Sequence, residues 1–226
     1  MCFEEWMEQF PAKEFPKNTR LFLQGDPLDY CFYLKQGICS QMINYENGIE
    51  VVAKYYFPGD LLNIWGVLKQ KNAYASTTVA KTDAYGIMIP ATAMRRELDQ
   101  NFSFYRWIVE SVLNKNQYVY QQYQKKSKGS TAEILCYAIL GLSQEDSNGR
   151  IYLSKDFSFC DLAQHLRIHR VSVSHVFKFL QENHVIQKCN RGWRILDVHA
   201  LQEYAQGNRI VDPHTSQAGE GRKSDA

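Results

Sequence analysis

Apolar residues recur at helical spacing in the last third of the chain. Leu162, Ala163 and Leu166 make one short apolar face. A second face follows, with apolar side chains at positions i, i+3, i+4 and i+7: Val173, Val176, Phe177 and Leu180. This periodicity predicts two helices that meet at a tight turn. Two short strand-like runs come next, on either side of a turn at residues 190–192, and they predict a β-hairpin. Together these elements predict a helix-turn-helix followed by a wing.

The first part of the chain has a different pattern. Between Phe15 and Pro90, short runs rich in β-branched and aromatic residues are separated by turn signals. The strands that these runs predict are Arg20–Leu23, Tyr30–Leu34, Ile38–Tyr45 and Glu50–Phe57. The pair Asn47–Gly48, between the last two, is a strong hairpin signal. So many short strands predict a sandwich or a barrel.

A long helix is predicted between these two regions, because no glycine or proline occurs from Ala91 to Lys128. Positions spaced alternately by four and three residues form a narrow seam along it: Ile108, Val112, Lys115, Val119 and Gln122. Such a seam can pair with its own copy, and the alternative is packing against the chain's own β domain. We expect a homodimer, because so long a helix exposes more surface than one small domain covers.

The patterns divide an α+β protein into four regions. We expect a β-rich domain over residues 1–97 and a dimerisation helix over 98–128. A polar stretch that ends in Gly129 predicts a hinge. The winged helix-turn-helix domain then covers 129–206, and its first helix starts near Thr131. The tail over 207–226 is rich in small and polar residues, which predicts disorder.

Composition sets limits on the classes of function. With 226 residues, 45% apolar and 22% charged, the chain has an ordinary globular composition with room for two modest domains. Its formal net charge of +2 is too small for a bulk field, so any affinity for nucleic acid must come from a local patch. No apolar run approaches the roughly 20 residues that cross a bilayer, and the N-terminus lacks the features of a secretory signal. We therefore expect a cytoplasmic protein without a membrane partner.

Motifs for catalysis and for metal binding are missing from the sequence. The six cysteines are scattered without a CxxC pair, which argues against a zinc ribbon or a compact iron-sulfur loop, and we expect them to be reduced thiols. The chain contains no G-x-S-x-G, Walker or H-E-x-x-H motif. We therefore predict that the protein is not an enzyme and binds no metal.

A local basic patch coincides with the predicted helix-turn-helix. Between Arg167 and Arg194 there are six cationic residues against a single acidic one, Glu182. The exposed start of the second helix carries further hydrogen-bond donors, which suit the phosphates and base edges of double-stranded DNA. The alternative is a pair of hairpins with a solvated charged face. Arg167 at the turn, where glycine is common, and His169 at the capping position favour that alternative.

The order of these domains resembles that of the CRP/FNR family of bacterial transcription factors. The segments that carry the resemblance are Gly25–Asp26, Tyr33–Gly37, Asn47–Gly48, Phe57–Asp60, Leu162–Leu166 and Arg170–His175. The resemblance implies a β-roll (jelly-roll-like) sensor domain of the cyclic-nucleotide-binding type. It also implies a homodimer on a palindromic operator with half-sites about 34 Å apart, and RNA polymerase as a further partner.

The resemblance also assigns roles at the DNA. The family's base-reading positions are occupied here by Arg170, Val171, Ser174 and His175. Val171 and His175 depart from the family pattern, so we expect a different operator sequence. The residues expected to contact phosphates, which position the protein without specifying sequence, are Ser172, Lys178, Arg191 and Arg194.

The effector-binding cassette departs from the family pattern. Members that bind cAMP have an acidic residue for the ribose and an Arg-Ser pair for the phosphate, whereas this chain has Ile64 and Tyr74–Ala75 at those positions. A buried phosphate without a guanidinium lacks its main charge partner, so we expect no cyclic nucleotide. An iron-sulfur cluster is not expected, because only Cys2 precedes Cys31. Haem is not expected either, because the histidines lie beyond residues 1–154, where the sensor should be.

The same cassette supplies aromatic and apolar side chains instead. With two tyrosines of the long helix, they form a predicted pocket for an aromatic or otherwise apolar effector: Asn63, Ile64, Trp65, Tyr74, Ala75, Tyr120 and Tyr123. The alternative is that these aromatic residues simply fill the core. For the whole chain, the competing hypothesis is a nucleotide-sensing or protein-interaction module that does not bind DNA.

Overall fold

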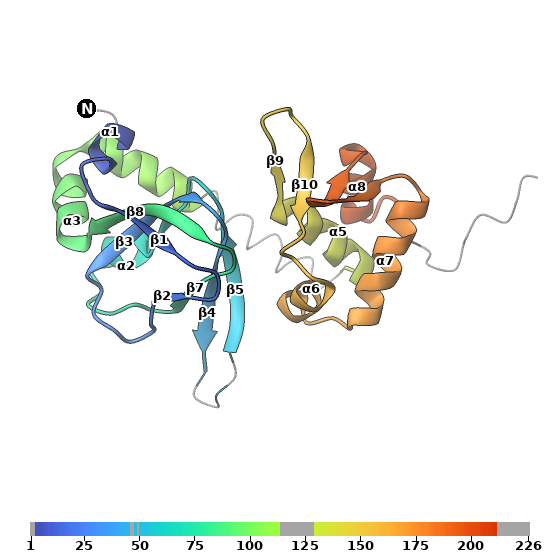
Figure 1. The fold of residues 1–226 in the computed structure, drawn as a ribbon, viewed down its shortest axis with the longest axis horizontal. Coiled ribbons are helices and arrows are strands. Elements are labelled where there is room, and N and C mark those ends of the chain that lie inside the picture. Colours follow the sequence, from blue (N-terminus) through green and yellow to red (C-terminus); the bar gives the residue numbers. More distant parts are fainter. Residues whose placement is uncertain (1–2, 46–47, 49, 114–128, 212–226) are drawn as a thin grey trace, which may run out of the picture. The chain divides into compact units, whose positions relative to one another are not determined.

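A computed structural model describes residues 3–45, 48, 50–113 and 129–211 of the chain. The chain divides into two compact units, residues 1–117 and residues 118–226, and each unit is described by itself (Figure 1). Within the described residues, no helix is both long enough and apolar enough to span a membrane.

The first unit is built mainly from short strands. In chain order it contains α1 (Phe3–Met7), β1 (Ala12–Phe15), β2 (Arg20–Phe22), β3 (Tyr30–Gln36), β4 (Cys39–Asn44), β5 (Glu50–Tyr56), β6 (Leu61–Leu62), α2 (Ile64–Leu68), β7 (Thr77–Ala80), β8 (Ala84–Pro90) and α3 (Ala91–Gln100). A further helix covers residues 102–113. The four strands predicted from alternation are present, with ends shifted by two residues at most.

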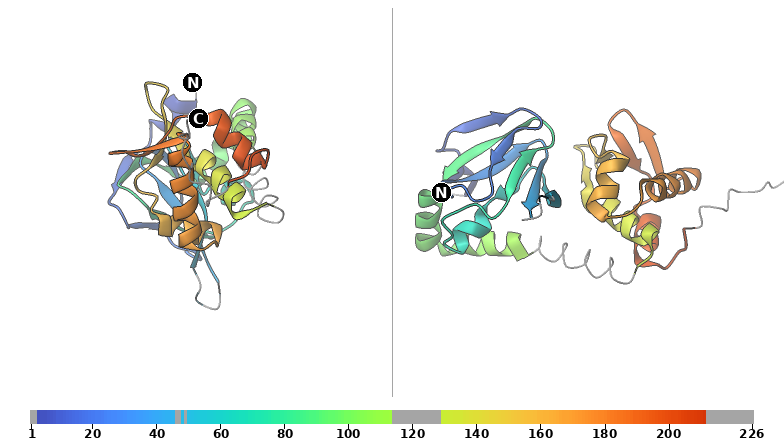
Figure 2. Two further views of the ribbon diagram at one scale, coloured as in Figure 1. Left: turned by 90° about the vertical axis from the view of Figure 1, so that its right-hand side faces the viewer. Right: turned by 90° about the horizontal axis from the view of Figure 1, so that it is seen from below.

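These strands form two antiparallel sheets, with orders β1-β8-β3-β6 and β2-β7-β4-β5. Alternate residues of the strands point inward, so Phe32 and Leu34 of β3 and Ile89 of β8 are fully buried. In Figure 2, α2, α3 and the helix over residues 102–113 gather on one side of the strands. Phe104 and Ile108 of that helix belong to the same core as the strands. The β-rich N-terminal domain and the α+β class are confirmed.

The helix predicted over residues 98–128 does not start where we expected. Leu98 belongs to α3, which ends at Gln100, and Asn101 is extended with φ −123° and ψ 94°. The Asn101 side chain then accepts a hydrogen bond from the Phe104 N–H at 3.1 Å, so it caps the helix that follows. Asparagine is a favoured N-cap residue, and the prediction of one continuous helix from residue 98 is therefore wrong.

Two residues of the predicted dimer seam pack inside their own unit. Ile108 is 1% exposed, and Val112 packs against the same core. For these two positions the alternative interpretation, packing against the chain's own β domain, describes the structure. The other seam residues, Lys115, Val119 and Gln122, lie outside the described residues.

The second unit is a small helical domain with one sheet. In chain order it contains α5 (Thr131–Leu142), β9 (Ser143–Glu145), β10 (Ile151–Ser154), α6 (Phe159–Leu166), α7 (Arg170–Glu182), β11 (Ile186–Cys189), β12 (Gly192–Ile195) and α8 (Val198–Gln206). The antiparallel sheet has the order β11-β12-β10-β9, so the predicted wing hairpin is present and a second hairpin, which we did not predict, extends it. The predicted disordered tail falls mostly outside the described residues, except for residues 207–211.

Candidate functional site

The helix-turn-helix begins at a complete capping box. The Ser158 side chain accepts a hydrogen bond from the Asp161 N–H at 3.1 Å, and the Asp161 carboxylate accepts one from the Ser158 N–H at 2.8 Å. This reciprocal pair satisfies two backbone donors at the start of α6. It fixes where the first helix of the motif starts.

Two residues that had favoured the alternative interpretation support the turn. Arg167 ends α6 in the left-handed conformation, with φ 57° and ψ 45°, so it occupies the position where glycine is common without breaking the motif. His169 caps α7, because its Nδ1 accepts a hydrogen bond from the Val171 N–H at 3.3 Å. A neutral imidazole nitrogen is an acceptor, and here it takes the role that a Ser or Thr hydroxyl commonly has at the start of a helix.

The apolar face of α7 packs inward as its periodicity predicted. Val173, Val176, Phe177 and Leu180 are all buried. The ring of Phe177 lies 4.7 Å from that of Phe159 in α6 and 4.9 Å from that of Trp193 in β12. This aromatic cluster ties α6, α7 and the wing together, so it fixes the wing relative to the second helix.

The opposite face of α7 carries the residues predicted to contact DNA. Arg170, Val171, Ser174, His175 and Lys178 are exposed, and Ser172 is half-buried. Val171 is 50% exposed although it is apolar. The core packs against the buried face of α7 and so sets the orientation of this helix. These six side chains therefore lie on the face that points away from the core.

The wing places its two predicted arginines differently. Arg191 lies next to the hairpin turn, where Gly192 has φ +130°. Its side chain is 71% exposed and contacts the Asp146 carboxylate at 3.2 Å. Backbone hydrogen bonds from Arg150 and Asn148, together with the Arg191 charge, hold the pKa of Asp146 below its ordinary value. Arg194 of β12 is only half-exposed, and its Nε is buried without a hydrogen-bond partner.

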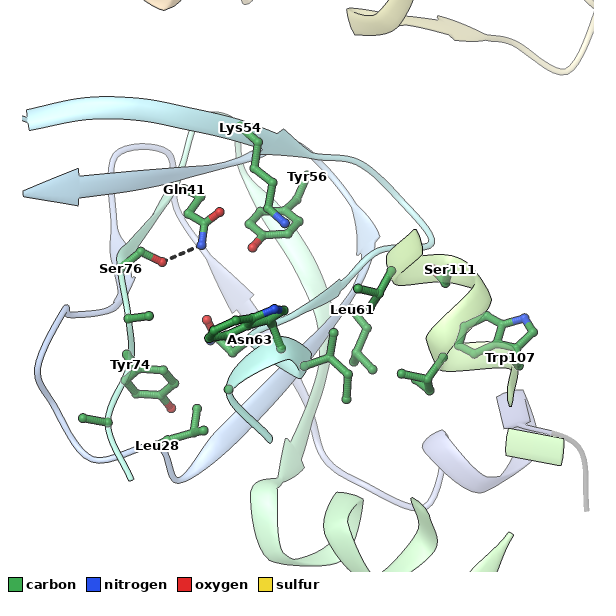
Figure 3. Close-up of a pocket in the computed structure, with 17 residues that line it drawn as sticks. Leu28, Gln41, Lys54, Tyr56, Leu61, Asn63, Tyr74, Ser76, Trp107 and Ser111 are labelled. Carbon is green, nitrogen blue, oxygen red and sulfur yellow. Dashed lines mark hydrogen bonds between the residues drawn. The ribbon is translucent and has the colours of Figure 1, made fainter. Parts of the chain in front are cut away.

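A cavity of about 280 Å³ lies inside the first unit (Figure 3). Five of the seven residues predicted for the effector pocket line it: Asn63, Ile64, Trp65, Tyr74 and Ala75. The other two, Tyr120 and Tyr123, lie outside the described residues. The helix over residues 102–113 closes one side with four residues: Trp107, Ile108, Ser111 and Val112.

The polar wall of the cavity was missed by the sequence analysis. It consists of Gln41 of β4, Lys54 and Tyr56 of β5, and Ser76, which precedes β7. The Gln41 side-chain amide donates a hydrogen bond to the Ser76 hydroxyl at 2.7 Å. The Lys54 ammonium lies 4.7 Å from the centre of the Tyr56 ring. The one available signal was the spacing of Lys54 and Tyr56, which are two apart and so share a face of their strand.

The tyrosine hydroxyls at the cavity differ in their partners. The Tyr74 hydroxyl donates to the Tyr30 carbonyl and accepts from the Tyr30 N–H, both at 3.1 Å. Burial raises the pKa of Tyr74 to about 12. Tyr74 therefore fixes the start of β3, and both hydrogen bonds of its hydroxyl are made to the backbone of Tyr30. Burial also raises the pKa of Tyr56 well above its ordinary value, and the Asp60 carboxylate adds to this shift. Tyr56 thus stays a neutral phenol.

Comparisons with known proteins match both units. A model of the cyclic nucleotide-binding domain matches residues 12–101, and a model of the Crp-like helix-turn-helix domain matches residues 134–204. No curated protein matches the chain significantly.

Solved structures share the fold over most of the chain. FixK2 from Bradyrhizobium japonicum is 12% identical with a TM-score of 0.74, and the match covers 86% of this chain and 96% of that one. TTHB099 from Thermus thermophilus, a transcriptional regulator of the CRP family, is 21% identical with a TM-score of 0.65 over 89% and 99%. CLP of Xanthomonas campestris, a global regulator responsive to c-di-GMP, is 15% identical with a TM-score of 0.63 over 86% and 97%.

Proposed function

Because the chain belongs to the CRP/FNR family of DNA-binding transcriptional regulators, we propose that it binds a palindromic operator as a homodimer under the control of a small organic effector. The family consists of regulators, not enzymes. We further propose that RNA polymerase is a partner and that the protein acts in the cytoplasm.

The outward face of α7 carries the DNA part of this proposal. Its exposed side chains combine guanidinium, ammonium, imidazole and hydroxyl groups on a helix whose other face is fully packed. Arg170, Ser174 and His175 can donate to base edges in the major groove, and the exposed methyl groups of Val171 can contact a thymine methyl. Ser172, Lys178, Arg191 and Arg194 supply phosphate contacts, which set the position of the protein on the duplex. Of these four, Ser172 and Arg194 are half-buried, and the Arg194 Nε is buried without a hydrogen-bond partner.

A second copy of the chain is proposed to pack on the helix over residues 102–113. Ile108 and Val112 serve the unit's own core, so the contact must use other positions. Phe102, Tyr105 and Leu113 are exposed apolar residues on this helix, and with half-buried Val109 they follow steps of three, four and four. That spacing forms one stripe, and such a stripe is a natural surface for a symmetric dimer.

The effector is proposed not to be a cyclic nucleotide. Among the described residues that line the cavity there is neither an arginine nor an acidic side chain. A cyclic phosphate would therefore lack a bidentate partner, and a ribose would lack a carboxylate acceptor. Of the relatives named above, CLP is responsive to c-di-GMP, so the choice of effector within this fold has to be argued from the cavity itself.

Selection from random duplex DNA followed by sequencing tests the DNA part. We expect enrichment of a palindrome whose half-sites lie about one helical turn apart. Arg170→Ala should cost about 1–3 kcal/mol and relax specificity at one position of each half-site. Lys178→Ala should weaken binding evenly across sequences and lower the salt slope by about one.

A matched control is Lys69→Ala, which removes an exposed lysine of the first unit. It should leave the affinity for DNA and the salt dependence of binding unchanged. If no sequence is enriched and binding disappears at modest salt, the DNA-binding proposal is wrong. The interaction-module hypothesis would then take its place.

A further inference from the structure

The distribution of charge in the cavity limits what it can hold. Lys54 is the one cationic side chain among the described lining residues, and none of these residues is acidic. Lys54 is half-buried, and its ammonium lies against the Tyr56 ring. A charge at such a partly enclosed position interacts more strongly with a ligand than one in bulk water. The cavity therefore favours an anion over a neutral or cationic molecule.

Hydrogen-bond donors gather beside that charge. The Ser76 hydroxyl accepts from Gln41, so its own hydrogen can be donated to a ligand. The Asn63 side-chain nitrogen is buried and has no hydrogen-bond partner, and the neutral Tyr56 phenol is a further donor. In Figure 3, Lys54, Gln41, Tyr56 and Ser76 lie together on one side of the cavity. Such a set suits a group that only accepts hydrogen bonds, as a carboxylate does.

The rest of the lining is apolar and the cavity is small. Leu28, Leu61, Ile64 and Val112 line it, together with the indole rings of Trp65 and Trp107. A volume of about 280 Å³ lies just below the usual range of about 300–1,000 Å³ for small-molecule sites, so the cavity suits a small ligand. An aromatic ring with one short acidic arm matches both the volume and the aromatic walls.

We propose that the cavity binds a small aromatic carboxylate, with its carboxylate on Lys54 and the neighbouring donors and its ring against the apolar walls. This inference rests on the proposed effector function and gives it a chemical class. A phosphodiester fits less well, because a lysine is a single point charge and cannot form the bidentate contact that an arginine forms.

The test compares two probes of nearly the same shape on the full-length protein. Phenylacetate carries the anionic group, and phenylacetamide replaces it with a neutral amide. Calorimetry gives the affinity, and quenching of Trp65 and Trp107 fluorescence reports on the cavity. We expect phenylacetate to bind at least about tenfold more tightly than the amide, because hydrogen bonds to a charged group are roughly twice as strong.

Variants at Lys54 separate charge from shape. Lys54→Met keeps most of the side-chain length but removes the charge. It should weaken the binding of phenylacetate by at least about tenfold and leave the affinity for phenylacetamide unchanged. Lys54→Arg should restore part of the affinity. The control is Lys13→Met, since Lys13 is also a strand lysine beside an aromatic ring, at 4.9 Å from the centre of Phe15, but does not line the cavity. It should have no effect. The thermal unfolding midpoint of each variant shows whether it folds.

Three results would overturn the inference: equal affinities for the two probes, unchanged phenylacetate binding in Lys54→Met, or no binding of phenylacetate at all. Tighter binding of cAMP than of phenylacetate, lost in Lys54→Met, would overturn it in favour of a phosphodiester. The selection of operator DNA is run both without a ligand and with a pool of small organic molecules, so its outcome does not depend on which class of effector the cavity binds. Failure of the effector class and failure of the DNA-binding function are therefore distinguishable.

Discussion

At the scale of single residues, Asp146 limits what Arg191 can offer to DNA. The two side chains are 3.2 Å apart, with Arg191 71% exposed and Asp146 15% exposed, and a contact in which the cation faces solvent contributes little to stability. Its greater effect is on the charge that the wing presents. Asp146→Asn should leave the fold unchanged, raise the affinity for non-specific duplex DNA several-fold and steepen its salt dependence, because one more cation becomes available to phosphates. Fluorescence anisotropy at several salt concentrations measures both.

The matched control for that variant is Glu145→Gln. Glu145 is an exposed residue of the same hairpin, and its replacement changes the net charge by the same amount. A long-range field effect would raise affinity equally in the two variants. An equal rise would therefore show that the contact between Asp146 and Arg191 does not govern the wing.

The cysteines give a second prediction at this scale. Cys31, Cys39 and Cys136 are buried, and burial raises the pKa of each thiol to about 12. Cys160 in α6 is exposed. Because the thiolate is the reactive form, a chromogenic thiol reagent at pH 8 should modify Cys160 quickly and the three buried residues only on unfolding. Cys160→Ser should remove a fast-reacting thiol. If the number of fast-reacting thiols is unchanged, Cys160 is less accessible than its exposure indicates.

At the scale of secondary-structure elements, the capping box of α6 should contribute to the stability of the fold and not to DNA recognition. Ser158→Ala removes one half of the reciprocal pair and should cost about 1 kcal/mol of unfolding free energy, within a range of about 0.5–2 kcal/mol. Urea denaturation measures this loss. Ser174→Ala is the matched serine in α7, exposed and on the face proposed to contact DNA, and it should weaken DNA binding without lowering stability. Equal losses of stability in both variants would contradict this division.

Periodicity predicted those helices and strands in which the buried residues are the apolar residues of a regular repeat. The apolar face of α7 and the alternating strands of the first unit came directly from spacing along the chain. The break at Asn101 did not, because asparagine is also tolerated inside helices and only its hydrogen bond to the Phe104 N–H reveals the cap. The polar wall of the cavity was hidden for another reason. The pairing of β4 with both β5 and β7 brings together Gln41, Lys54 and Ser76. This register cannot be predicted from the sequence of any single strand.

At the scale of the whole molecule, tight binding of a palindromic operator should depend on the proposed dimer contact, which is formed by the apolar stripe on the helix over residues 102–113. Leu113 is 60% exposed, and a symmetric contact would place it against its counterpart in the second copy. Leu113→Glu would bring two carboxylates into that apolar contact, where an uncompensated charge is costly. We expect a monomer by sedimentation velocity at micromolar concentration. The affinity for a palindromic operator should fall by about 100-fold or more, because two linked half-site contacts become one.

The affinity of the same variant for a single half-site should stay unchanged, because α7 and the wing belong to a separate compact unit. Leu23→Glu provides the control, since it introduces the same charge at another exposed leucine of the first unit, 41% exposed, and should leave the dimer intact. If Leu113→Glu remains dimeric and binds the palindrome as tightly as before, the stripe is not the dimer contact. The second copy would then have to bind another surface, and the spacing of the two α7 helices on DNA would need a different explanation.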